Sequence, residues 1–183
     1  MDSYVYVRIE PGTMATVLTQ LAITQGVRGA VAVVGDWDIL AQVEGPDLAA
    51  IAITILDQIH SVAGVNATMT APVVPPDRVG IAGWGAPQSP GLVRDACYVH
   101  IKVEAGAAAG LAERLSELQD VSGVAVLGGE YDLLVCVAQP WEIASGVILE
   151  QIHGLPGILA TKTLVSISYE DPDPERDRFS TWN

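Results

Sequence analysis

The sequence predicts an α+β fold in which two tandem βαββαβ units form a pseudo-dimer within one chain. Two observations lead to this prediction: an internal repeat, and a regular alternation of apolar residues inside each copy. The chain has 183 residues, of which 50% are hydrophobic and 17% are charged. It therefore has enough apolar material for two small packed cores, and its composition is not that of a disordered protein.

The repeat is carried by matching segments at a nearly constant offset. Three pairs are the clearest: YVYVRIE at 4–10 and YVHIKVE at 98–104, GDWDIL at 35–40 and GEYDLL at 129–134, and LDQIH at 56–60 and LEQIH at 149–153. One deleted residue is enough to keep the two copies aligned. The predicted organisation is a first domain at 1–74, a Pro/Gly-rich linker at 75–97, a second domain at 98–170 and an acidic tail at 171–183.

The first copy shows the expected order of elements. Residues 4–10 alternate between apolar and other side chains, as in a strand with one face in a core. Apolar residues in 14–21 follow at helical spacing, and two β-rich runs are then separated by the hairpin signal Gly35-Asp36. A second helix is expected over 46–60 and a last strand over 65–74. This βαββαβ order is that of the ferredoxin-like fold.

Some side chains of the first strands need a second cover. Tyr6, Arg8, His100 and Lys102 point away from the helix side, although they belong to central strands. We therefore expect the two sheets to pack against each other within the chain. Apolar residues surround most of the second helix of the first copy, which favours a contact in a homo-oligomer over a deep intramolecular core.

Charge and composition exclude several functions. The 22 acidic and 9 basic residues give a net charge of −13, and no segment is basic, so we expect no direct nucleic-acid binding. Mean hydropathy is +0.36, but no apolar run approaches the ~20 residues of a membrane span. The chain start lacks the features of a signal peptide, and Cys97 and Cys136 cannot form a disulfide framework. These features predict a cytoplasmic protein without a membrane partner.

Motifs for catalysis are absent from the sequence. No nucleophile elbow, no cysteine paired with a nearby histidine as in a nucleophilic site, and no phosphate-binding loop is found. His60 and His153 occupy equivalent helix ends, where a partly cationic ring complements the helix dipole, and neither has partners at metal-ligand spacing. We therefore expect no catalytic residue, no metal and no cofactor.

The two hairpins are the candidate ligand-binding site. Their residues are Gly35, Asp36, Trp37 and Asp38 in the first copy, and Gly129, Glu130, Tyr131 and Asp132 in the second. Glycine-rich backbone N–H groups can bind a carboxylate, Asp38 or Asp132 can bind an ammonium, and the aromatic ring can cover an apolar group. Turn chemistry alone also explains glycine and aspartate here, and that alternative stays open.

The pattern in both copies resembles the effector-binding (RAM) domain of the Lrp/AsnC regulators, most closely in the second copy. The resemblance rests on Gly129–Leu134, on IHGLPGI at 152–158, and on Thr161 and Thr163. It implies a dimer made by sheet-to-sheet packing that commonly assembles to an octamer, with amino acids bound near the hairpin between subunits. Thr161 and Thr163 become candidate ligand contacts, although β-propensity also explains them. The first strand begins near Tyr4, which implies a stand-alone module without the family's helix-turn-helix.

Three functional hypotheses follow. The first is a non-enzymatic regulatory module that binds an amino acid or related metabolite and acts through oligomerisation, or through a DNA-binding or other partner protein. The second is a cofactor-free enzyme of the dimeric α/β-barrel type, similar to monooxygenases. The third is a purely structural scaffold. The sequence favours the first hypothesis.

Overall fold

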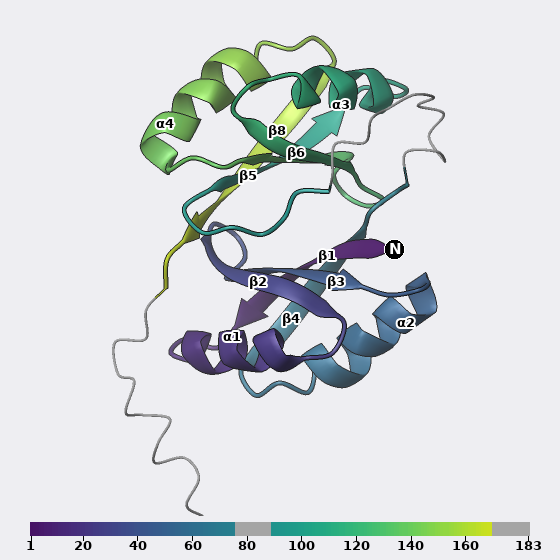
Figure 1. Ribbon diagram of the computed structural model, residues 1–183, viewed down its shortest axis with the longest axis vertical. Coiled ribbons are helices and arrows are strands. Elements are labelled where there is room, and N and C mark those ends of the chain that lie inside the picture. Colours follow the sequence, from purple (N-terminus) through teal and green to yellow (C-terminus); the bar gives the residue numbers. More distant parts are fainter. Residues whose placement is uncertain (76–88, 170–183) are drawn as a thin grey trace, which may run out of the picture.

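The computed structural model describes residues 1–75 and 89–169 (Figure 1). The first unit consists of β1 (Asp2–Ile9), α1 (Met14–Ile23), β2 (Val27–Val34), β3 (Ile39–Glu44), α2 (Leu48–Ile53), η1 (Thr54–Ile59) and β4 (Val65–Pro72). The second consists of β5 (Cys97–Val103), α3 (Ala108–Ser116), β6 (Val121–Val126), β7 (Leu133–Val137), α4 (Trp141–Gly146), η3 (Val147–Ile152) and β8 (Ile158–Ile167). The predicted α+β class with two βαββαβ units is confirmed. Residues 76–88 of the predicted linker and the predicted tail lie outside the described residues.

The eight strands of the described residues form one antiparallel sheet, in the order β4-β1-β3-β2-β8-β5-β7-β6. Each half has the strand order of a ferredoxin-like unit, and β2 pairs with β8 to join the halves, with Ala32 opposite Ile167. The two outer edges meet again through a β-bridge between Val73 and Leu127. The sheet therefore curls back on itself, and these contacts protect parts of the edges that each half would otherwise expose.

The helices cover the outside and the two halves of the sheet face each other. In Figure 1, α1 and α2 lie below the first half, while α3 and α4 lie above the second. Each helical layer has its own buried core, represented by Val7 and Leu21 in the first half and by Ile101 and Leu115 in the second. The predicted packing of sheet against sheet within one chain is confirmed.

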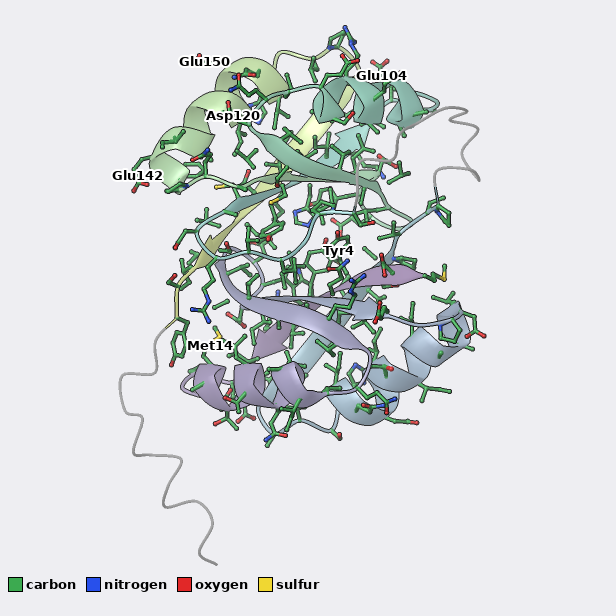
Figure 2. All side chains as sticks on the ribbon, in the orientation of Figure 1. Tyr4, Met14, Glu104, Asp120, Glu142 and Glu150 are labelled. Carbon is green, nitrogen blue, oxygen red and sulfur yellow. The ribbon has the colours of Figure 1, made fainter. Side chains whose placement is uncertain are left out.

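A third core fills the space between the two facing halves of the sheet. Tyr6 and Leu40 of the first half and Tyr98 and Leu134 of the second are almost completely buried there. Tyr4 lies between the halves as well, as Figure 2 shows, and its hydroxyl donates to the Pro90 carbonyl oxygen at 2.7 Å. Because both copies contribute to this core, neither half is complete without the other.

The second helix of each copy changes its winding in the middle. The α-helical turns of α2 and α4 continue into the π-helical segments η1 and η3, where the His60 N–H donates to the Ile55 carbonyl oxygen at 2.9 Å. These helices leave apolar side chains in contact with solvent: Leu48, Ile53, Leu56, Trp141, Ile143 and Leu149. Among the described residues, no helix is long and apolar enough to cross a membrane.

Candidate functional site

The two hairpins converge on one cavity between the sheets. Asp36 and Trp37 come from the β2–β3 hairpin, and Glu130 and Tyr131 come from the β6–β7 hairpin. The cavity has a volume of about 220 Å³, and its other walls come from six strand residues: Tyr6, Arg8, Met69, His100, Lys162 and Leu164. Four of the eight hairpin residues predicted as ligand-binding therefore line this cavity.

A close approach of the two halves fixes the first hairpin. Gly35 has a φ of +153°, and a Cβ at this position would overlap the side chain of Leu164 on the opposite half. The Leu164 side chain would have to move aside for any other residue, and L side chains rarely adopt this backbone conformation. The Lys162 ammonium also forms an ion pair with the Asp36 carboxylate across the same junction.

The deepest polar groups of the cavity are a histidine and a tyrosine from opposite halves. The Tyr6 hydroxyl and His100 Nε2 are 2.6 Å apart, and His100 Nδ1 lies 3.3 Å from the Lys162 carbonyl oxygen. Because a carbonyl oxygen can only accept, Nδ1 carries the hydrogen and the Tyr6 hydroxyl donates to Nε2. Burial lowers the pKa of His100 to about 4, and burial raises the pKa of Tyr6 above its ordinary value. The pair is thus neutral at pH 7.

Aromatic rings form a continuous row through the site. The ring centroids of Trp37 and Tyr6 are 6.1 Å apart, those of Tyr6 and His100 are 5.1 Å apart, and those of His100 and Tyr131 are 5.2 Å apart. The Arg8 guanidinium lies 4.8 Å from the centroid of the Trp37 ring, a cation–π geometry. The row provides a rigid apolar surface with tilted ring planes.

Equivalent cations hold the two hairpin tips. Arg8 Nη2 donates to the Asp36 carbonyl oxygen at 2.9 Å, and Lys102 Nζ donates to the Glu130 carbonyl oxygen at 2.8 Å. Lys102 Nζ also lies 3.6 Å from a carboxylate oxygen of Asp132. Each hairpin is thus fixed by a basic residue from the first strand of its own copy.

Asp38 and Asp132 hold the hairpins and do not line the cavity. The Asp38 carboxylate accepts from the Ile9 N–H at 2.9 Å, and the Asp132 carboxylate accepts from the Val103 N–H at 2.9 Å. The first bond ties the start of β3 to the end of β1, and the second ties the start of β7 to the end of β5. Both aspartates thus make bonds between strands, 29 residues apart in sequence, and not the bonds to their own turn that the sequence analysis left open.

Replacing Asp132 with alanine should lower the free energy of unfolding by about 1.5–3 kcal/mol, because the Val103 N–H loses a charged acceptor. Asp132→Asn should cost less, since its amide oxygen can still accept. Urea denaturation measures both changes, and Glu113→Ala on an exposed face of α3 is the matched control, expected within about 0.5 kcal/mol of the wild type. Equal stability of Asp132→Ala and the control would contradict this structural role.

Thr161 and Thr163 lie on the other face of β8. They pair in register with Ile101 and Val99, whose side chains belong to the helix-side core. Thr161 Oγ1 is 2.7 Å from Nε2 of His153. The structure therefore does not bring the two threonines together with the hairpin residues at the cavity.

The same contact is present in the first copy, where Thr68 Oγ1 is 2.7 Å from Nε2 of His60. Sequence reasoning treated the histidines and the threonines separately and missed this pairing. A spacing of eight residues between histidine and threonine, repeated in both copies, was the signal that could have indicated it. Among the described residues, no group of three potential metal ligands is found.

Sequence reasoning also assigned none of the six strand residues of the cavity to the site, and two of them, Lys162 and Met69, could have been noticed. The two copies align ATMT at 67–70 with ATKT at 160–163, so these residues occupy equivalent positions. The methionine-to-lysine difference was visible in that alignment. It places a cation in one half of the cavity and a thioether in the other.

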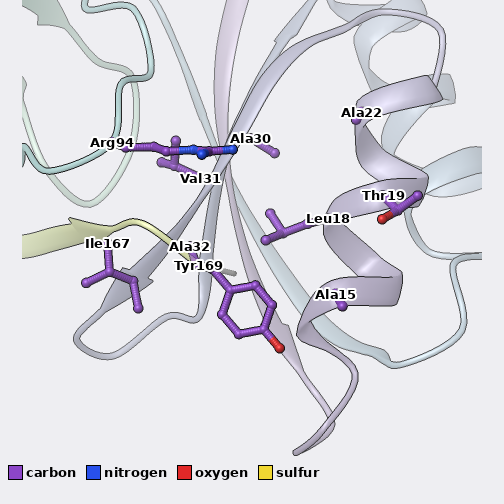
Figure 3. Close-up of a pocket in the computed structure, with 10 residues that line it drawn as sticks. All are labelled: Ala15, Leu18, Thr19, Ala22, Ala30, Val31, Ala32, Arg94, Ile167 and Tyr169. Atoms are coloured by element: carbon purple, nitrogen blue, oxygen red, sulfur yellow. The ribbon is translucent and has the colours of Figure 1, made fainter. Parts of the chain in front are cut away.

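A second hollow, of about 330 Å³, lies between α1 and β2 (Figure 3). Leu18 and Thr19 line it from the helix, and Arg94, Ile167 and Tyr169 line it from the other side. Small alanine side chains make up much of the remaining wall, and Arg94 is exposed. None of the described residues that line the hollow is a buried polar side chain that would select a ligand, so the hairpin cavity is the better candidate site.

Comparison with protein families supports the class of domain that the hairpins and the fold define. Residues 3–75 match the model of the Lrp/AsnC ligand binding domain. This match confirms the resemblance that the motifs predicted. It falls on the first copy, whereas the motif comparison had favoured the second. No curated protein matches the chain.

Solved structures resemble the chain over one or both halves. The siroheme decarboxylase NirDL, in complex with an iron-uroporphyrin III analogue, has a TM-score of 0.60 and 10% identity, covering 92% of this chain and 71% of that one. A putative chlorite dismutase, TA0507, has a TM-score of 0.50 and 11% identity, and the match covers 94% of this chain and 95% of that one. A hypothetical protein from Pyrococcus horikoshii has 25% identity and a TM-score of 0.38, and the match covers 43% of this chain and 94% of that one. At 10–11% identity, the first two show a shared fold only.

Proposed function

We propose that this protein is a regulatory module that binds an amino acid or a similarly small zwitterionic metabolite in the hairpin cavity. The observation that carries the proposal is the convergence of both hairpins, each with an acidic and an aromatic residue, on one cavity. Its volume of about 220 Å³ is below the ~300–1,000 Å³ of pockets for drug-sized ligands. An amino-acid-sized ligand fits that scale.

The chemistry of the walls supports a zwitterion. Arg8 and Lys162 supply positive charge, and Asp36 and Glu130 supply negative charge. The neutral His100–Tyr6 pair adds hydrogen-bonding capacity without a further charge. In this proposal the aromatic row covers the ligand's apolar part, and Asp38 and Asp132 act by holding the hairpins in place.

The outer helices provide a way for binding to be transmitted. Leu56 is 61% exposed and Leu149 is 60% exposed, and each lies among other exposed apolar residues of its helix. Apolar patches of this kind often mark protein–protein contacts. We propose that copies of the chain, or a partner protein, associate through these helices, as the sequence analysis expected for the second helix.

A cofactor-free enzyme is the second candidate. The buried pair of Tyr6 and His100 at a cavity supports it, because such a pair can exchange a proton with a bound substrate. The space between each sheet and its helices, in contrast, is filled by tightly buried aliphatic residues. We favour the binding module because the family model that matches the first copy is that of a ligand-binding domain.

Differential scanning fluorimetry against the twenty amino acids tests the proposal. A ligand present at 100 times its Kd should stabilise the folded state by ~2.7 kcal/mol and raise Tm accordingly. We expect one or a few amino acids to do so and to change the oligomeric state measured by light scattering. If no amino acid raises Tm at millimolar concentration, the binding proposal is overturned and the scaffold hypothesis replaces it.

A further inference from the structure

The hairpin cavity is built from equivalent residues of two copies, but it is not symmetric. Asp36 of the first hairpin corresponds to Glu130 of the second, and Trp37 corresponds to Tyr131. Next to Asp36 stands Lys162, which pairs with it across the two halves. The position equivalent to Lys162 is Met69, which pairs in register with Tyr6 and cannot neutralise an acid.

The acidic residues of the two hairpins differ in their cation partners. On the Asp36 side, the Lys162 ammonium pairs with the Asp36 carboxylate, and the Arg8 guanidinium donates to the Asp36 carbonyl oxygen. On the Glu130 side, Lys102 Nζ donates to the Glu130 carbonyl oxygen and lies 3.6 Å from an Asp132 carboxylate oxygen, and among the described residues no basic side chain forms an ion pair with the Glu130 carboxylate. The acid of the first hairpin is thus neutralised by a cation of the opposite half, whereas the acid of the second hairpin has no such partner among the described residues.

We propose that Lys162 is a built-in substitute for the ligand's ammonium group. Lys162 already pairs with Asp36, the acidic residue of one half, so a single ligand binds per chain. The ligand's ammonium then lies at Glu130, and its apolar side chain packs against Met69 and Tyr131. Methionine and tyrosine form an adaptable apolar wall at that place. This inference rests on the proposed function, and it restricts the ligand class to primary amines with an apolar group, α-amino acids above all.

Titration calorimetry tests the stoichiometry and the role of the ammonium. The probes are the amino acid that binds best among the twenty, the amine that lacks its carboxylate, and the acid that lacks its ammonium. We expect one site per chain for the amino acid and binding at least tenfold weaker for the deaminated acid than for the amine. Two equal sites per chain, or a deaminated acid that binds as well as the amine, would overturn the inference.

Variants of the two equivalent acids test the orientation. Glu130→Gln should weaken binding at least tenfold, whereas Asp36→Asn should change it less than threefold. Met69→Lys should abolish binding, because it places a second internal ammonium beside Glu130. Glu150→Gln, an exposed acid on η3, is the matched control and should bind as the wild type does.

The outcomes separate this inference from the function on which it rests. Circular dichroism and the urea midpoint first establish that each variant is folded. If the wild type binds an amino acid but Asp36→Asn is weakened as much as Glu130→Gln, the site is symmetric and the inference fails while the function stands. If the wild type binds none of the twenty, the proposed function itself fails.

Discussion

Replacing Leu134 with alanine should lower the free energy of unfolding of the whole chain by about 2–5 kcal/mol, because it removes a fully buried side chain from the core between the sheets. Its equivalent in the first copy, Leu40, is also fully buried in that core, and Leu40→Ala should cost a similar amount. Both halves contribute to the same core, so each variant should shift one common transition rather than melt one half alone.

Urea denaturation followed by far-UV circular dichroism measures this effect. The control is Leu149→Ala, since Leu149 is 60% exposed and its truncation should change stability by about 0.5 kcal/mol or less. Two separate transitions, with only one of them moved by Leu134→Ala, would show that the halves fold independently. A single shifted transition in both core variants would establish the pseudo-dimer as one cooperative unit.

Lowering the pH from 7.5 to 4.5 should destabilise the wild type by about 2–3 kcal/mol more than it destabilises His100→Gln. In the unfolded chain the His100 imidazole titrates with its ordinary pKa of 6.5, while burial lowers its pKa in the folded state to about 4. Between these values the unfolded state binds more protons than the folded state. The contribution of this histidine to stability is therefore complete above pH 6.5 and is lost progressively as the pH falls toward 4.

The comparison between variants removes the carboxylates from the result, because they titrate in both proteins. Free energies of unfolding from urea at pH 7.5, 6.0 and 4.5 give the difference. Tyr6→Phe is the matched control: it removes the hydroxyl bound to Nε2 but leaves the imidazole buried, so it should keep the steep pH dependence. Parallel curves for the wild type and His100→Gln would show that the ring does not titrate as its burial implies.

Much of the fold could be predicted because it depends on local periodicity. The alternation in 4–10 and 98–104 defines two faces, and the polar and aromatic residues on the second face required a cover that the other copy provides. Closure of the sheet could not be predicted in the same way. The β2–β8 pairing and the bridge between Val73 and Leu127 join segments far apart in sequence, and no period encodes which edges meet.

The site was predicted less completely, for a related reason. The hairpin motifs identified Asp36, Trp37, Glu130 and Tyr131, because glycine-containing turns with repeated acidic and aromatic residues stand out in a sequence. The ion pair between Lys162 and Asp36 joins residues separated by 126 positions and depends on how the halves dock. Thr161 and Thr163 were expected to share one face of their strand, but the sequence does not say which face, and the structure turns both toward the helices.

Covalent linkage of the two halves has a consequence for how the protein responds to its own abundance. Two separate subunits dissociate when they are diluted, but halves joined in one chain face each other at an effective concentration on the order of millimolar for short flexible linkers. The core between the sheets should therefore persist at any expression level. A response that depends on cellular dose can arise only at the next level of association, where Leu56 and Leu149 remain exposed on the outer helices.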